Sequence, residues 1–341
     1  MTKHGLYLEA ELTHLYELIL PVAPYIIANS SIYDMEQSAA VEEFVVRIKS
    51  KYIERRLNRE RQWPPCKSEK LVRLELVEGG KRQDYSAGQT RGECDKAVQR
   101  SPLAYSNILK AKDGERAVRK VLVEGDAGIG KTTLCTALSE DWANEKLFQE
   151  FEILLLLHLR QNQIASAGSL LGLLKLLHSS SEICALVAKY IEDQNKEKVL
   201  IIADGWDELS TEDRSEGSFL YELLFGECYS LSVIVTSRPS ASVTFHELRC
   251  IDRFVEVHGF SNDNIKEFIQ CEFASERDRV KGSGLLAQLE SNPLIESVCS
   301  IPLNCAIVCH LWNWFDGALP TTMSELYTKI ILNIILRNIR K

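Results

Sequence analysis

The chain has 341 residues, of which 45% are apolar and 26% are charged, and its formal net charge is −8. A chain of this length exceeds what one hydrophobic core usually holds, so we expect two or three domains. The negative charge excludes a broad electrostatic attraction to nucleic acid or to an anionic membrane, because such partners usually demand a basic face.

The N-terminal segment lacks the features of a secretory signal. Acidic residues interrupt its apolar positions, so it has no continuous apolar core of the kind that a signal peptide carries. Elsewhere no stretch reaches the ~18 apolar residues that indicate a membrane span. The sequence therefore predicts a cytoplasmic protein without a membrane-spanning helix.

The ten cysteines are scattered, with no CxxC pair and no histidine-rich partner segment. A chain of this size does not need disulfide bonds to fold, so we interpret them as reduced, mostly buried thiols. The densest set, Cys299, Cys305 and Cys309, could be a metal site. A stripe facing the core is the favoured interpretation, because cysteine is among the most buried residue types.

Residues 1–78 are predicted to be a mostly helical N-terminal region. Apolar residues recur at helical spacing from Leu6 to Ile27 and again from Met35 to Leu57. The basic run Lys51–Arg61 has interleaved glutamates, which is typical of a solvated, salt-bridged helix face rather than of a nucleic-acid site. Residues 79–116 are rich in Gly, Ser and charged residues, and we expect a linker or loop region there.

Residues 117–260 are predicted to form an α/β domain. Short β-rich apolar runs alternate with amphipathic segments, and this alternation predicts a parallel sheet with helices on both faces. The runs are continuously apolar, which indicates strands that are covered on both sides. They are VLVEG, FEILLLLHL, KVLIIADG, LSVIVTSRP and RFVEVHGF.

After Phe260 no convincing strand remains, and residues 261–320 are predicted to be a helical domain that begins with Ser261 as an N-cap. Residues 321–341 contain an amphipathic segment whose apolar face needs a partner. We expect from this face that the sequence is a fragment or a truncated gene product.

The strongest functional signal is VLVEGDAGIGKTT, which satisfies the phosphate-loop pattern GxxxxGK[ST] between a strand and a helix. Glycines let successive N–H groups point at phosphate oxygens, and the helix N-terminus adds partial positive charge. Lys131 would reach the β and γ phosphates, and the Thr132 hydroxyl would ligate Mg²⁺. The predicted nucleotide-binding residues of this loop are Gly125, Asp126, Ala127, Gly128, Ile129, Gly130, Lys131, Thr132 and Thr133.

Acidic residues follow the strand KVLIIADGWDEL at the edge where open α/β sheets bind ligands. Asp204 is predicted to hold Mg²⁺ together with Thr132. Asp207 and Glu208 lie on the same loop, and either could orient an attacking water, because hydrolysis needs an acceptor near the γ-phosphate. Spacing does not choose between them.

Another predicted strand, LSVIVTSRP, ends in Arg238 before a proline. A cation at this edge could sense or stabilise the γ-phosphate, as arginines do in phosphoryl transfer. The alternative is an ordinary surface arginine, and the two neighbouring motifs favour the catalytic role.

Together GDAGIGKTT, DGWDEL and TSRP resemble the NACHT domain of the STAND class of P-loop NTPases, as found in NOD-like receptors. The resemblance covers roughly residues 117–341, and NPLIESVCSIPLNCAIVC is similar to the proline motif of the family. This implies that Pro302 contacts the nucleotide. Only the start of the family's winged-helix domain, around Met323, is present, and no sensor repeats follow. The region before the phosphate loop is similar to that of invertebrate receptor-like proteins.

The resemblance implies a signalling switch in innate-immune-like sensing. ATP in place of ADP, with Mg²⁺, would favour an oligomer-competent state, and slow hydrolysis would reset it. The expected partners are copies of the chain or other proteins on activation, and signalling proteins that the sequence does not identify.

Three other classes are considered from the residues alone. A metabolic P-loop kinase would transfer phosphate to an acceptor, although the helical region offers no clustered basic residues for a phosphorylated one. A motor acting on nucleic acid is disfavoured by the acidic balance. A GTPase is disfavoured because no NKxD motif follows the acidic strand.

Overall fold

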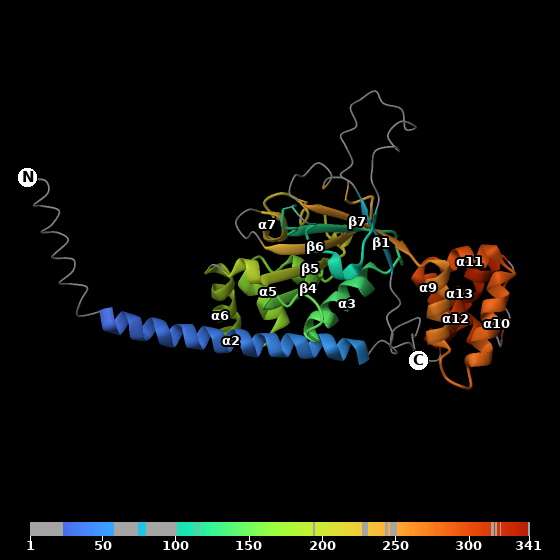
Figure 1. Ribbon diagram of the computed structural model, residues 1–341, viewed down its shortest axis with the longest axis horizontal. Coiled ribbons are helices and arrows are strands. Elements are labelled where there is room, and N and C mark those ends of the chain that lie inside the picture. Colours follow the sequence, from blue (N-terminus) through green and yellow to red (C-terminus); the bar gives the residue numbers. More distant parts are fainter. Residues whose placement is uncertain are drawn as a thin grey trace, which may run out of the picture.

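The computed structural model places a seven-stranded sheet at the centre of the protein and a helical unit beside it (Figure 1). The residues that it describes are 23–57, 74–79, 101–112, 114, 116–193, 195–226, 231–242, 245, 251–314, 317, 319–320 and 322–339. Among these, no helix is long and apolar enough to cross a membrane.

The strand order across the sheet is β2-β1-β7-β3-β6-β5-β4. The strands are β1 (Glu75–Gly79), β2 (Ser101–Pro102), β3 (Lys120–Glu124), β4 (Ile153–His158), β5 (Val199–Asp204), β6 (Ser232–Ser237) and β7 (Arg253–Gly259). The five strands from β3 to β7 are parallel, and they are the five apolar runs that the sequence predicts. The prediction of a parallel α/β sheet is confirmed.

Helices lie on both sides of this sheet, as predicted. In chain order they are α3 (Lys131–Ala143), α4 (Asn162–Ala165), α5 (Leu170–Leu177), α6 (Ser181–Glu192) and α7 (Phe219–Phe225). In Figure 1, α3, α5 and α6 lie below the sheet and α7 lies at its other side. Strands β5 and β6 are buried along their whole length and β4 is buried up to its last residue, which explains why their sequences are continuously apolar.

The long helix α2 (Ala23–Leu57) belongs to the same hydrophobic core as the sheet. It runs along the outer side of α3 and α6 (Figure 1), and Phe44, Ile48 and Tyr52 are buried there. The helix predicted from Met35 to Leu57 is therefore present. Its residues were predicted to lie in the N-terminal region 1–78, and they pack on the α/β domain.

The basic run in the last turns of α2 is only partly solvated. Glu54 is exposed as expected, whereas the Lys51 ammonium donates to the Leu177 carbonyl and Tyr52 is buried. One side of this helix segment thus packs on the α/β domain, because apolar residues are interspersed among its charged residues. Residues 58–61 of this run, and residues 1–22 with most of the first predicted helix, lie outside the described residues.

Strand β1 is a feature that the sequence analysis missed. It pairs antiparallel with β7, with Leu76 opposite Val257 and buried, and β2 pairs antiparallel with β1 in turn. Arg253 on β7 is buried and donates through Nε to Glu78 of β1 at 2.9 Å. The predicted linker region 79–116 thus contributes a short strand and the 3-10 helix η3 (Tyr105–Asn107) in its described part.

The helical unit after Phe260 has its own hydrophobic cluster. Its helices are α9 (Asn262–Glu272), α10 (Arg279–Glu290), α11 (Pro293–Cys299), α12 (Pro302–Trp314) and α13 (Met323–Ile339). Ser261 caps α9 by accepting a hydrogen bond from the Asn264 N–H, as predicted. Cys299, Cys305 and Cys309 are buried in this cluster, so their core-facing interpretation is confirmed.

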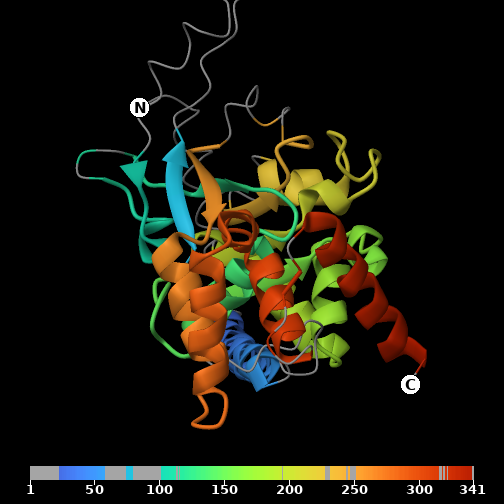
Figure 2. The ribbon, with the colours of Figure 1, turned by 90° about the vertical axis from the view of Figure 1, so that its right-hand side faces the viewer.

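Helix α13 is set apart from the other four helices (Figure 2). Leu326 packs into the helical cluster, but several large apolar side chains of α13 are exposed. They are Tyr327, Ile331, Leu332 and Ile335. The apolar face that the sequence predicts is thus present and mostly uncovered in this structure.

Candidate functional site

The phosphate-loop motif forms the turn between β3 and α3. Gly128 and Gly130 have φ angles of 76° and 107°, a left-handed conformation that only glycine adopts at little cost. Gly130 is the N-cap of α3, and it supplies no side-chain hydrogen bond to the first turn. The N–H groups of that turn remain available for an anion, and the helix dipole favours negative charge there.

Two leucines from distant segments pack against the glycines of this loop. A Cβ atom at Gly130 would lie 2.8 Å from Cδ1 of Leu74, which precedes β1. A Cβ atom at Gly128 would lie 3.1 Å from Cβ of Leu303 on α12. The glycines are therefore required by close packing as well as by backbone conformation.

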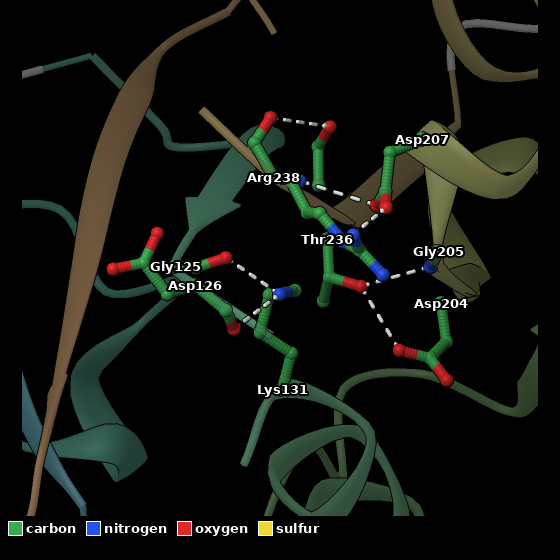
Figure 3. Close-up of polar contacts among 9 residues, drawn as sticks. Gly125, Asp126, Lys131, Asp204, Gly205, Asp207, Thr236 and Arg238 are labelled. Carbon is green, nitrogen blue, oxygen red and sulfur yellow. Dashed lines mark hydrogen bonds and ion pairs between the residues drawn. The ribbon is translucent and has the colours of Figure 1, made fainter. Parts of the chain in front are cut away.

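Lys131 folds back over the loop (Figure 3). Its Nζ donates to the carbonyl oxygens of Gly125, at 2.6 Å, and Asp126, at 3.0 Å. Burial lowers the pKa of Lys131, and the nearby Asp207 carboxylate opposes this shift. The ammonium is held by neutral carbonyl groups that a phosphate oxygen could replace with a stronger, charge-assisted bond.

Asp204 ends β5 and is hydrogen-bonded on both oxygens. Its Oδ1 accepts from the Thr236 hydroxyl at 2.9 Å, and its Oδ2 lies 3.2 Å from Nδ1 of His158. Burial favours the neutral acid, yet hydrogen bonds from His158, Thr132 and Thr236 outweigh it and lower the pKa of Asp204. Asp204 is therefore an ionised carboxylate with a fixed orientation.

Asp207 and Arg238 are partners of each other (Figure 3). Asp207 accepts from the Arg238 backbone N–H at 3.1 Å and pairs with its Nε at 2.9 Å. The Asp207 side chain is 10% exposed and that of Arg238 is 51% exposed. Glu208 is exposed and lies beside Gly205. In this structure the carboxylate of Asp207 is thus paired with the guanidinium of Arg238.

Pro302 is the first residue of α12, and this end of the helix touches the phosphate loop. The N–H of Leu303 donates to the Gly128 carbonyl at 3.2 Å, and Gly259 and Phe260 adjoin Ser300 in the same junction. The structure therefore places Pro302 next to the loop. Its contact with a nucleotide stays a prediction.

A Mg²⁺ ion fits the oxygen atoms at this edge. The Thr132 hydroxyl is within hydrogen-bonding reach of the ionised Asp204 carboxylate, and hard oxygen ligands are those that Mg²⁺ prefers. Among the described residues, no group of three or more His, Cys, Asp or Glu side chains could hold a metal ion by itself. Mg²⁺ commonly uses one or two carboxylates and completes its shell with phosphates and water, and Thr132 with Asp204 suits that mode.

Sequence reasoning missed three neighbours of the site: His158, Leu74 and Leu303. For His158 the signal was available in the register of the predicted strands. His158 ends one predicted strand as Asp204 ends another, and the carboxyl ends of parallel strands share one edge of the sheet. For Leu74 and Leu303 no sequence signal existed, because their contacts depend on how separate segments pack.

Comparisons with known proteins identify the family of the central segment of the chain. Residues 119–276 match the family model of the NACHT domain. NACHT, LRR and PYD domains-containing protein 3 of Bos taurus is 28% identical over 263 residues, which are 71% of this chain and 25% of that protein. The human protein 12 of the same series is 30% identical over 62% of this chain and 21% of its own length.

The chain spans about a quarter of the length of these relatives. Among solved structures, a single-substitution variant of RuvB from Thermotoga maritima aligns with a TM-score of 0.33 and 12% identity, over 64% of this chain and 63% of that one. The matched family segment runs from the start of β3 to beyond α9, and it contains the phosphate loop, Asp204 and Arg238. Residues 119–276 of this chain therefore form a NACHT domain of the STAND class of P-loop NTPases.

Proposed function

We propose that this chain is an ATP-binding signalling switch that hydrolyses ATP slowly, and that its nucleotide state controls self-assembly. One observation carries the proposal. The phosphate loop, Asp204 and Arg238 meet at one edge of the sheet, and the first turn of α12 is bonded to the same loop. A site of this kind can bind a triphosphate and report its presence to the helical unit.

Phosphate binding would use Lys131 and the first turn of α3. Lys131 would exchange its bonds with the Gly125 and Asp126 carbonyls for the β and γ phosphates. The N–H groups from Ala127 to Thr132 would donate to phosphate oxygens, aided by the helix dipole. Thr132 and Asp204 would hold Mg²⁺, which neutralises charge on the phosphates when it is bound.

Arg238 would distinguish ATP from ADP. Its side chain is half-exposed and pairs with Asp207 through Nε, so a γ-phosphate can compete for the guanidinium. The exposed Glu208 is then the better candidate to orient the attacking water, because Asp207 already has a cationic partner. The sequence left these two residues as equal alternatives.

A switch requires that the nucleotide bind one conformation more tightly than the other. The hydrogen bond from Leu303 to Gly128 would couple the phosphate loop to the helical unit, because a loop that closes on phosphate would move the first turn of α12. Activated chains would assemble with copies of themselves or with related proteins, and would engage signalling proteins not yet identified. The similarity to NACHT, LRR and PYD domains-containing proteins supports a role in innate-immune-like sensing.

The test is binding and single-turnover hydrolysis of radiolabelled ATP with Mg²⁺, with size-exclusion chromatography in parallel. Lys131→Ala should lose about 10-fold to 100-fold in ATP affinity, because a charge-assisted hydrogen bond contributes about 1.5–3 kcal/mol. Asp204→Ala should bind ATP but hydrolyse it far more slowly. Lys198→Ala is a matched control, since Lys198 pairs with Glu152 at the opposite end of β5.

The wild-type chain should retain nucleotide, hydrolyse it slowly and change its assembly state with ATP. If neither ATP nor ADP binds, or if Lys131→Ala behaves like Lys198→Ala, the proposal is wrong. Turnover that becomes fast only when a small-molecule acceptor is added would favour a phosphotransferase instead.

A further inference from the structure

His158 and Asp204 are the last residues of two neighbouring parallel strands. They are register partners in the pairing of β4 with β5. Side chains at the same register of adjacent strands point to the same face of a sheet, so the pair is built into the sheet geometry. Both side chains are nearly buried, at 12% exposed for His158 and 9% for Asp204.

The hydrogen bond between them has a defined direction. Oδ1 of Asp204 accepts from the Thr236 hydroxyl, and a carboxylate only accepts hydrogen bonds. Nδ1 of His158 must therefore carry a proton where it faces Oδ2 at 3.2 Å. A neutral imidazole with its proton on Nδ1 and an imidazolium both satisfy this contact.

The two oxygens of Asp204 are held by different elements. Thr236 of β6 donates to Oδ1 at 2.9 Å, and the same hydroxyl accepts from the Gly205 N–H at 2.9 Å. His158 of β4 holds Oδ2 from the other side. Donors on both oxygens fix the plane of the carboxylate, and the remaining lone pairs are then oriented before any ligand arrives.

The strand that carries His158 is itself fixed on both edges. On the inner edge, the N–H of Leu159 donates to the Asp204 carbonyl at 2.9 Å. On the outer edge, the hydroxyl of Tyr52 on α2 accepts from the Leu156 N–H at 2.8 Å and donates to the Leu154 carbonyl at 3.1 Å. The imidazole is therefore presented from a backbone that has little freedom to shift.

We propose that His158 is a positioning residue, whose Nδ1–H group holds the Asp204 carboxylate in the orientation that receives the Mg²⁺–nucleotide complex. This inference rests on the proposed function, because it assigns His158 a part in the same site. A purely structural role for a buried histidine would affect the folding of the chain. The positioning role predicts instead that loss of His158 lowers metal affinity separately from folding and from metal-free nucleotide binding.

The experiment measures two affinities on the full chain. Binding of ADP is measured in EDTA, and binding of Mn²⁺ to the ADP-loaded chain is measured by electron paramagnetic resonance, with Mn²⁺ as a probe for Mg²⁺. His158→Leu keeps the bulk but removes the donor. We expect Mn²⁺ affinity to fall by about 10-fold to 100-fold, the usual effect of losing an outer-sphere partner, while metal-free ADP affinity stays within about threefold.

Two further variants test the position of the donor. The amide nitrogen of Asn lies near the position of Nδ1, so His158→Asn should restore most of the Mn²⁺ affinity. His158→Gln places its amide one methylene farther away and should not restore it. His258→Leu is the matched control. His258 also lies near the end of a strand, and its Nε2 is 3.3 Å from Oε2 of Glu256, but it does not contact Asp204.

The outcomes separate this inference from the proposed function. If the wild-type chain binds no nucleotide, both fail together. If it binds ADP and Mn²⁺ normally but His158→Leu is unchanged, or weakens both affinities equally, only the positioning role is wrong. If His158→Leu does not fold, equal Mn²⁺ affinities in the Asn and Gln variants would overturn the inference.

Discussion

The site contains two carboxylates with opposite constraints. Asp204 is buried and accepts hydrogen bonds on both oxygens from side chains of the two neighbouring strands. Asp207 is held by the guanidinium of Arg238, whose side chain is half-exposed. The first carboxylate is held by protein partners on both oxygens, whereas the second could exchange its half-exposed arginine partner for another. The fixed and the exchangeable carboxylate thus lie side by side on one edge of the sheet.

The largest effect on stability is expected from Thr236→Val, which removes a hydrogen bond to the Asp204 carboxylate while keeping the shape of the side chain. Thr236 is fully buried, and its hydroxyl serves both Asp204 and the Gly205 N–H. Leaving such groups without a partner should lower the free energy of unfolding by about 1–3 kcal/mol. Urea denaturation measures this, with Thr328→Val on exposed α13 as the control. Equal stability of the two variants would contradict the account.

A smaller loss is expected from Tyr52→Phe, which releases the outer edge of the strand that carries His158. The variant leaves the Leu156 N–H and the Leu154 carbonyl without their hydroxyl partner, at a cost of about 1–2 kcal/mol. Tyr190→Phe removes a hydroxyl from a contact with the exposed Glu152, and should change stability by less than about 0.5 kcal/mol. Hydrogen exchange at the Leu156 amide should rise in the first variant and stay unchanged in the second.

The smallest stability effect is expected from Arg238→Ala, because the arginine is half-exposed and such ion pairs contribute about 0–1 kcal/mol. Its effect on ligand choice should be larger. Losing one charge-assisted bond to the γ-phosphate should reduce the preference for a non-hydrolysable ATP analogue over ADP by about tenfold. Isothermal titration calorimetry of both nucleotides checks this. A uniform loss of affinity for both would mean that Arg238 does not read the γ-phosphate.

The sequence was sufficient for the parallel part of the fold, because continuous apolar runs mark strands that are buried on both faces. It was insufficient for β1, whose five residues include two glutamates and a glycine. Their strand conformation depends on pairing with β7, which is a tertiary effect. For the same reason the docking of α2 could not be read from its helical spacing alone.

The site was predictable where one segment carries the whole motif, as in the phosphate loop and the Asp204 loop. It was not predictable where partners come from separate segments. The pairing of Asp207 with Arg238 joins two loops, and the contacts of Leu74 and Leu303 with the glycines join the loop to distant elements. Such contacts follow from strand order and packing, for which a single sequence gives only indirect signals.

The bond from Leu303 to Gly128 has a mechanical consequence. Helix α12 has 13 residues and is therefore about 20 Å long. Its first turn rests on the phosphate loop, and α13 contacts the same helix. A helix of this length moves as a rigid unit, so a displacement of the phosphate loop would displace α12 as a whole. Because α13 contacts α12, its exposed apolar side chains would change position together with that helix.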